Sequence, residues 1–174
     1  MKLLYSIHKY DVFMFTWLIN ARMHSTLTKV SRYLSKTGDG QLYLVIIGLL
    51  YWSEGLDGPF LQAVLLAFLI ERPIYFVLKN GLKRNRPQAA LQNFRSTITP
   101  SDKFSFPSGH TSAAFMMATL LGYYLPSLMI LLYCWAALVG FSRVVLGVHF
   151  PTDTLVGVIL GISTALFSLG QIVT

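Results

Sequence analysis

The chain has 174 residues, of which 54% are hydrophobic and only 12% are charged, about half the charged share of a soluble domain. This composition excludes a disordered chain, which would be polar, and an ordinary soluble globule, whose surface needs more polar residues. The single cysteine excludes a disulfide-stapled secreted scaffold. The sequence therefore predicts an integral membrane protein, and its net charge of +7 favours anionic partners.

Runs without charge divide the chain into helices. The run from Phe104 to Ser142 is long enough for two spans of about 20 residues, and Pro126 near its middle favours a turn. A kink is expected at Pro73. We predict an all-α polytopic membrane helix bundle, one domain over residues 1–174, with about six transmembrane helices near 9–30, 40–54, 58–80, 108–125, 127–147 and 151–172.

The first helix has the shortest apolar stretch, and basic residues follow it, so it could instead lie in the membrane interface. A signal peptide over residues 1–24 fits less well, because Lys9 and Asp11 precede the apolar stretch and no small-residue cleavage site follows. The sequence assigns no role to residues 1–40.

Nine of the 21 charged residues collect in two loops, Lys79–Lys103 and Arg143–Asp153. Membrane segments exclude charge unless it serves a function, and six alternating helices bring both loops to the same side of the bilayer. The other bases of the first loop, Lys83, Arg84 and Arg95 with Lys103, are expected to add positive potential for anionic headgroups.

The first motif places Lys79 seven residues before Arg86, so both can face one way if the helix continues. A lysine supplies a compact charge and an arginine a bidentate fork, which together suit a phosphoryl group. The alternative is a basic flank that only anchors the helix at the membrane surface.

The second motif, Pro107-Ser108-Gly109-His110, opens the fourth helix. Serine is a favourable N-cap residue, glycine allows close approach to the backbone, and free N–H groups at a helix start attract anions. His110 in the first turn would face that anion. The alternative is a capped helix start with a polar histidine at the interface.

The third motif joins Ser142-Arg143, at the end of the fifth helix, to His149 and Asp153. The last two residues are four apart, so one turn brings them together. An aspartate that accepts from one imidazole nitrogen leaves the other free as nucleophile or base. The alternative is a structural ion pair at a helix start.

In combination, the three motifs resemble the type 2 phosphatidic acid phosphatase family, whose fold is shared with the vanadium haloperoxidases. The family pattern is Lys, six residues, Arg-Pro; then Pro-Ser-Gly-His; then Ser-Arg, five residues, His, three residues, Asp. Every position matches in order and spacing. The resemblance covers about residues 58–172, and residues 1–57 carry none of the signature.

The resemblance implies that His149 attacks phosphorus and forms a phosphohistidine, that Asp153 orients it, and that His110 protonates the leaving oxygen and then activates water. It also implies a set of phosphate-binding residues: Lys79, Arg86, Ser108, Gly109 and Arg143. Fixed cations beside lipid suit phosphoryl transfer. No cofactor is implied and the sequence has no metal-ligand cluster, so we expect activity without a divalent metal.

The expected function is hydrolysis of a lipid phosphate or diphosphate, with undecaprenyl pyrophosphate, phosphatidylglycerol phosphate, phosphatidate and lipid A 1-phosphate as candidates by resemblance. The alternatives are a lipid phosphotransferase that uses the same phosphohistidine and a non-catalytic lipid-binding membrane protein. The expected partners are the bilayer and an anionic lipid phosphate, without nucleic acid; the oligomeric state is open.

Two arguments disagree on which membrane face carries the site. With six alternating helices, eleven Lys and Arg residues lie on the catalytic side and only Lys2 and Lys9 on the opposite side, which favours a cytoplasmic site. Bacterial members of the resembled family place it on the periplasmic or outer face of the inner membrane. We expect the family's arrangement, because several of these bases can serve an anionic substrate.

Overall fold

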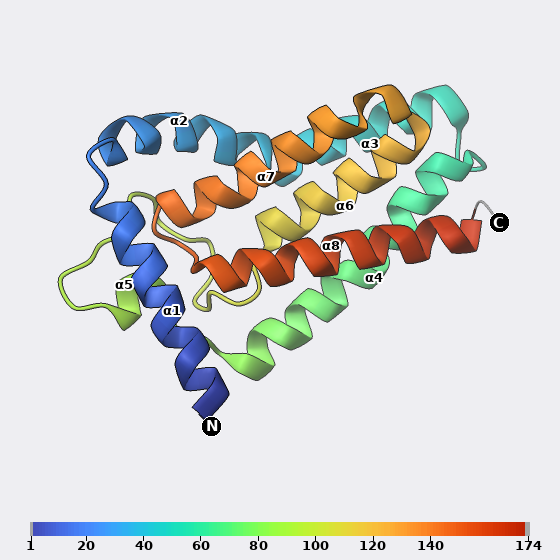
Figure 1. Ribbon diagram of the computed structural model, residues 1–174. Coiled ribbons are helices and arrows are strands. Elements are labelled where there is room, and N and C mark those ends of the chain that lie inside the picture. The colour runs from blue at the N-terminus through green and yellow to red at the C-terminus, as the bar shows by residue number, and fades with distance from the viewer. Residues whose placement is uncertain (1, 173–174) are drawn as a thin grey trace.

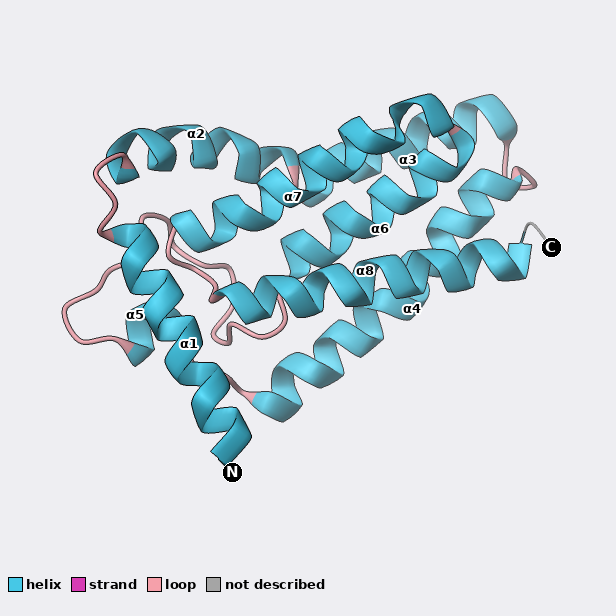
Figure 2. Cartoon of the chain, in the orientation of Figure 1, coloured by secondary structure: helices cyan, strands magenta, loops and turns pink. Residues whose placement is uncertain are grey.

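The computed structural model describes residues 2–172, which contain helices and no strand. Figures 1 and 2 show the all-α architecture that the sequence predicts. The helices are α1 (Lys2–Ile19), α2 (His24–Thr37), α3 (Gly40–Glu54), α4 (Pro59–Leu82), α5 (Pro87–Ala90), α6 (Gly109–Tyr124), the 3-10 helix η1 (Pro126–Leu128), α7 (Met129–Val145) and α8 (Pro151–Ile172).

Helix α6 lies at the centre of the bundle, packed against α7 and α8, while α4 packs on α8 and α3 on α4. Because α6 is hydrophobic nearly all round, it is buried along most of its length. Small residues let α8 approach it closely. A Cβ on Gly157 would lie 2.8 Å from the Ser108 carbonyl oxygen, and a Cβ on Gly161 would lie 2.2 Å from that of Ser112.

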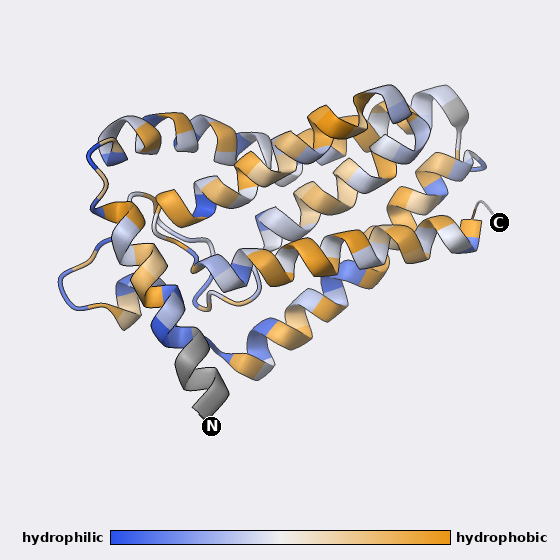
Figure 3. Cartoon of the chain, viewed as in Figure 1, coloured by the Kyte–Doolittle hydropathy of each residue, from blue (hydrophilic) through white to orange (hydrophobic). Residues whose placement is uncertain are grey.

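Within residues 2–172, three segments are long and apolar enough to cross a membrane: Pro59–Leu82, Pro126–Val145 and Pro151–Ile172. The first continues through Pro73 as one helix. Large apolar side chains such as Leu69, Ile130 and Ile159 are exposed. Figure 3 shows hydrophobic residues along most of α7 and α8. The chain is therefore a polytopic membrane helix bundle.

The helix expected over 9–30 is wrong, because the structure has two helices there, separated by residues 20–23. The apolar stretch ends at this break, and α2 is too polar to continue it through lipid. Helix α2 runs beside α7, with Ser31 and Ser35 buried. Helix α1 crosses the end of the bundle at which α8 begins (Figure 1), so Lys2 and Lys9 belong to that end and not to the opposite one.

Candidate active site

Four helix ends meet at one end of the bundle: the C-termini of α4 and α7 and the N-termini of α6 and α8 (Figure 1). The loops between them bring the three motifs into contact, as alternating helices predict. The Ser108 N–H donates to the Asp153 carbonyl oxygen at 3.0 Å. Arg86 Nη1 donates to the Val148 carbonyl oxygen at 2.7 Å.

His149 lies in the loop before α8, only 2% exposed. Its Nε2 is 3.5 Å from Arg86 Nη1, and its Nδ1 is 3.7 Å from Asp153 Oδ2, longer than a hydrogen bond. Burial, reinforced by nearby arginines against the opposing effect of Asp153, lowers the pKa of His149 to about 4. The imidazole is therefore neutral near pH 7 and keeps a lone pair for attack.

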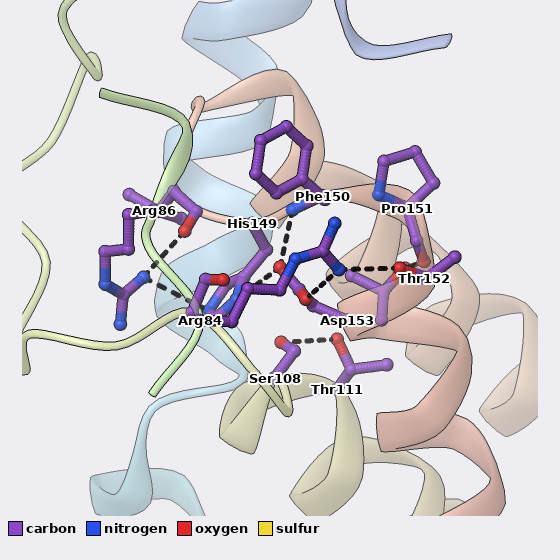
Figure 4. Close-up of polar contacts among 12 residues, drawn as sticks. Arg84, Arg86, Ser108, Thr111, His149, Phe150, Pro151, Thr152 and Asp153 are labelled. Carbon is purple, nitrogen blue, oxygen red and sulfur yellow. Dashed lines mark hydrogen bonds and ion pairs between the residues drawn. The ribbon is translucent and has the colours of Figure 1, made fainter. Parts of the chain in front are cut away.

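Asp153 is completely buried and held from two sides (Figure 4). Its Oδ2 accepts from the Phe150 N–H at 2.7 Å, and its Oδ1 accepts from Arg84 Nη1 at 2.7 Å. The arginine balances the charge of the carboxylate while the backbone bond fixes its position. Arg84 is thus part of the site, whereas the sequence suggested only a contribution to surface potential.

Arg84 also connects the site to the first helix of the chain. Its Nη2 donates to Asp11 Oδ2 at 2.5 Å, and Asp11 Oδ1 accepts from the Thr152 N–H at 3.0 Å. Asp11 is 1% exposed. A buried carboxylate needs such partners, so α1 is attached to the start of α8 by ionic contacts as well as by packing.

Lys79 and Arg86 meet on a residue that the motifs do not contain. Asp102 Oδ2 accepts from Lys79 Nζ at 2.9 Å and from the Tyr75 hydroxyl at 3.0 Å. Asp102 Oδ1 accepts from Arg86 Nη2 at 2.5 Å. The two cations therefore do face one way, with a carboxylate between them.

Arg86 does not lie on a continuation of the helix that carries Lys79, an arrangement that the sequence allowed. Helix α4 ends at Leu82, and Lys83 adopts a left-handed conformation with φ 48°. The proline at 87 disfavours helical geometry at the residue before it, so a loop and not a continued helix carries the arginine to Lys79.

Asp102 stays ionised because of these contacts. Its burial alone would raise the pKa, but the hydrogen bonds from Lys79 and Arg86 outweigh burial and lower the pKa of Asp102 to about 2. The sequence did hold a signal for this residue, since Asp102 is the only acid between Glu71 and Asp153.

Ser108 is the N-cap of α6, as its sequence position predicts, but its hydroxyl is 2.9 Å from the Thr111 hydroxyl and makes no bond to a backbone N–H. Gly109 permits the expected close approach, because a Cβ there would lie 2.9 Å from Tyr75 Cε2. A larger residue would push the tyrosine ring away from its position beside Lys79.

His110 has a partner that sequence reasoning missed. Its Nε2 lies 2.8 Å from Oδ1 of Asp39, in the turn between α2 and α3. The two residues are 71 positions apart, and a single aspartate in a turn gives no periodic signal. Both line a cavity of about 670 Å³ that also contains Arg143.

Arg143 is 5% exposed, and its Nη1 donates to the Ser35 hydroxyl at 2.5 Å. Its Nε is buried without a hydrogen-bond partner in the described structure. A buried guanidinium N–H without an acceptor is costly, so this part of the cavity is suited to an anion. Two histidines and three motif cations at one membrane face can bind and attack a phosphoryl group.

Comparisons with known proteins identify a family for the chain. The family model described as PAP2 superfamily matches residues 60–174. Phosphatidylglycerophosphatase B of Bacillus subtilis is 35% identical over 132 residues, which are 68% of this chain and 61% of that protein. The match thus spans less than two thirds of the relative's length.

Two solved structures share the fold. The crystal structure of Aquifex aeolicus LpxE has a TM-score of 0.79 and 28% identity, covering 91% of this chain and 94% of the other. The transmembrane PAP2-type phosphatidylglycerolphosphate phosphatase from Bacillus subtilis has a TM-score of 0.76 and 30% identity, covering 95% of this chain and 86% of the other. At 91% and 95% of the chain, both likenesses extend beyond residues 60–174, the range of the family model.

Proposed function

The chain belongs to the PAP2 superfamily, and from that premise we propose that it is a membrane phosphatase that hydrolyses a lipid phosphate or diphosphate through a phosphohistidine. The observation that carries the proposal is the buried His149, with an arginine beside one ring nitrogen and an aspartate beside the other. The names of its relatives, which include a phosphatidylglycerophosphatase, support the same class of reaction.

In the first step, His149 Nε2 attacks phosphorus, and the bond from phosphorus to the leaving oxygen breaks. Nδ1 then carries the ring proton toward Asp153, whose fixed carboxylate stabilises the positive imidazole. Arg86, 3.5 Å from Nε2, is placed to hold a non-bridging oxygen of the phosphoryl group. In the second step, water attacks the phosphohistidine and inorganic phosphate leaves.

His110 is the proposed general acid for the leaving oxygen and the base for the attacking water. It lies at the cavity, where water can reach it, and Asp39 fixes one of its nitrogens. Because the His110 side chain is partly exposed at this cavity and solvent can reach it, we favour hydrolysis over the two alternatives. A phosphotransferase would need the acceptor to compete with this water, and a purely binding protein would have no use for the two histidines.

The phosphate is held by Lys79, Arg86 and Arg143, together with Ser108 and the Gly109 N–H at the start of α6. Asp102 forms ion pairs with Lys79 and Arg86. The phosphate therefore binds beside this carboxylate and interacts with the same two cations. Because these side chains supply the positive charge that phosphoryl transfer needs, we propose that catalysis requires no divalent metal.

The test is phosphate release by detergent-purified protein from a panel of lipid phosphates and diphosphates in the presence of a strong chelator. We expect activity that disappears in His149→Gln and persists in His24→Gln, a substitution of a histidine outside the motifs. Stopping the reaction with alkali should leave an acid-labile phosphate label on the protein. Activity lost to chelator and restored by magnesium, or an unlabelled active enzyme, would reject the mechanism.

We further propose that the site faces the periplasm or outer side of a bacterial inner membrane. The loops and chain segments at the far end of the bundle contain no Lys or Arg, and their acids are Glu54 and Asp57. By the positive-inside rule alone this favours a cytoplasmic site. We give that rule less weight here because many of the bases at the catalytic end have partners or line the cavity.

A further inference from the structure

The cavity beside His110 has a second positively charged wall. One side is formed by His110 and Arg143 of the proposed active site, and the other by three bases of α2, namely Lys29, Arg32 and Lys36. The cavity volume of about 670 Å³ exceeds what a single phosphate needs. The bases lie at intervals of three and four residues, so they share one face of the helix.

Helix α2 is fixed to the active site at two points. The Ser35 hydroxyl accepts from Arg143 Nη1 at 2.5 Å, and Asp39, just beyond the end of α2, bonds His110 at 2.8 Å. Lys36 directly follows the serine, and Arg32 lies one turn before it. These contacts hold the row of bases at a set position relative to the reacting phosphate.

The charge balance of the cavity favours an anion. Asp39 is the only acid among its described lining residues, and its carboxylate is bonded to His110. The three α2 bases are exposed, while Arg143 is buried and has an Nε–H without a partner in the described structure. A bound anion would satisfy this donor and neutralise the facing lysines and arginine.

We propose that Lys29, Arg32 and Lys36 bind the second, non-reacting phosphate of a lipid diphosphate. The inference rests on the proposed phosphatase function and specifies its substrate class. The motif residues next to His149 bind the terminal phosphate, and the bridging oxygen faces His110. The inner phosphate lies in the cavity against α2.

This arrangement gives α2 a role in the chemical step. As His149 bonds to the terminal phosphorus, the bond from that phosphorus to the bridging oxygen breaks, and its electron pair remains on the oxygen. His110 supplies a proton to this oxygen, and the lipid leaves as a monophosphate. Negative charge grows on the leaving phosphate, where the α2 bases stabilise it. When the substrate is a monophosphate, the lipid leaves as an alcohol. It then has no second phosphate for the α2 bases to stabilise.

A basic helix at a membrane surface has another common use, attraction to anionic lipids. Attraction to the membrane and a phosphate subsite predict different effects on monophosphate and diphosphate substrates. Surface attraction raises the local concentration of every anionic substrate, whereas a subsite for the inner phosphate acts on diphosphates alone. The two are separated by comparing substrates with the same hydrocarbon chain.

The experiment compares the wild type with the triple variant Lys29→Gln/Arg32→Gln/Lys36→Gln in neutral detergent micelles. Phosphate release is measured from one isoprenoid lipid as its monophosphate and as its diphosphate. We expect the ratio of the two kcat/KM values to shift at least tenfold against the diphosphate, about 1.4 kcal/mol. The matched control Lys9→Gln/Arg22→Gln/Arg95→Gln removes three exposed bases outside this cavity and should keep the wild-type ratio.

Equal losses on both substrates, or no loss on either, would overturn the subsite, because the α2 bases would then only attract lipid or do nothing. A wild type that releases phosphate from the monophosphate but not from the diphosphate would also overturn it while leaving the proposed function in place. A wild type that hydrolyses neither lipid would remove the proposed function itself. Monophosphate turnover by the triple variant reports that it is folded.

Discussion

Asp39 Oδ1 lies 2.8 Å from Nε2 of His110, although the two residues are 71 positions apart. The bond joins the turn between α2 and α3 to the first turn of α6. It gives the proposed general acid a carboxylate partner, as Asp153 serves the proposed nucleophile. Asp39 is thus a positioning residue for His110, and its effect should depend on how much the leaving group needs a proton.

Replacing Asp39 with Asn should lower kcat for lipid phosphates roughly 10- to 100-fold, because a well-placed general acid contributes about 100- to 10,000-fold. An aryl phosphate with a weakly basic leaving group needs little protonation, so its phosphorylation step should lose far less. The two rates are compared under single-turnover conditions. The same loss on both substrates would indicate a structural role only.

Asp102 places a fixed negative charge between two phosphate-binding cations. Asp102→Asn should therefore bind the phosphate analogue orthovanadate more tightly, roughly 3- to 30-fold for one charge removed near the site. At the same time kcat should fall, because Lys79 and Arg86 lose their shared anchor. The measurement is the inhibition constant, with Asp57→Asn at the far end of the bundle as the control. Weaker vanadate binding in Asp102→Asn would contradict the prediction.

His149 should make the fold sensitive to mild acid. Its pKa is about 4 in the folded protein, below the ordinary histidine pKa of about 6.5, so the unfolded chain binds more protons between these values. Stability present above pH 6.5 is lost as the pH falls toward 4, by up to about 3 kcal/mol. The stabilising charge of Asp102, with a pKa of about 2, is lost only at lower pH.

The check is the melting temperature in detergent at pH 7.5 and pH 4.5, for the wild type and for His149→Gln. The variant cannot take up this proton, so its melting temperature should fall less on acidification. Parallel decreases in both proteins would show that other groups govern the acid response.

The contact between α8 and α6 should not tolerate a methyl group. Gly161→Ala would place a Cβ 2.2 Å from a backbone oxygen of α6, which cannot move without shifting that helix. We expect a loss of about 1–3 kcal/mol, measured as a lower melting temperature. Gly170→Ala, in the same helix but with nothing within 4 Å of its Cβ, should be neutral or slightly stabilising.

The membrane face can be tested at the C-terminus, because α8 starts at the catalytic end and finishes at the other (Figure 1). A site on the outer face puts Thr174 in the cytoplasm. A fluorescent reporter fused after Thr174 should therefore be active, and a periplasm-dependent phosphatase reporter inactive. The opposite pattern would place the site in the cytoplasm, as the positive-inside rule favours.

The sequence predicted the part of the fold that depends on composition and local signals. The bounds 40–54 and 151–172 agree with α3 and α8, because glycine or proline marks both starts. The helix over 9–30 was wrong, since hydropathy alone did not reveal the break at residues 20–23. Helix alternation predicted which loops would meet, because two helices separate the loop Lys79–Lys103 from the loop Arg143–Asp153.

The contacts that complete the site were not predictable in this way. Asp39 and Ser35 reach His110 and Arg143 only because α2 packs on α7, a tertiary arrangement with no local pattern. Nothing in the sequence distinguishes Arg84 from the other bases of its loop. Its role follows from its position between Asp11 and Asp153 in the structure. A single charged residue acquires its meaning from neighbours that lie far away in the chain.

The partners supplied by Asp11, Ser35 and Asp39 lie outside residues 60–174, the range of the family model. Two kinds of evolutionary constraint should therefore coexist in this chain. Positions 110, 143 and 149 should be fixed across the whole family, whereas position 39 should vary between lineages that attach different amino-terminal helices and covary with the residues it contacts. A boundary drawn where the motifs begin would separate the reacting groups from the residues that orient them.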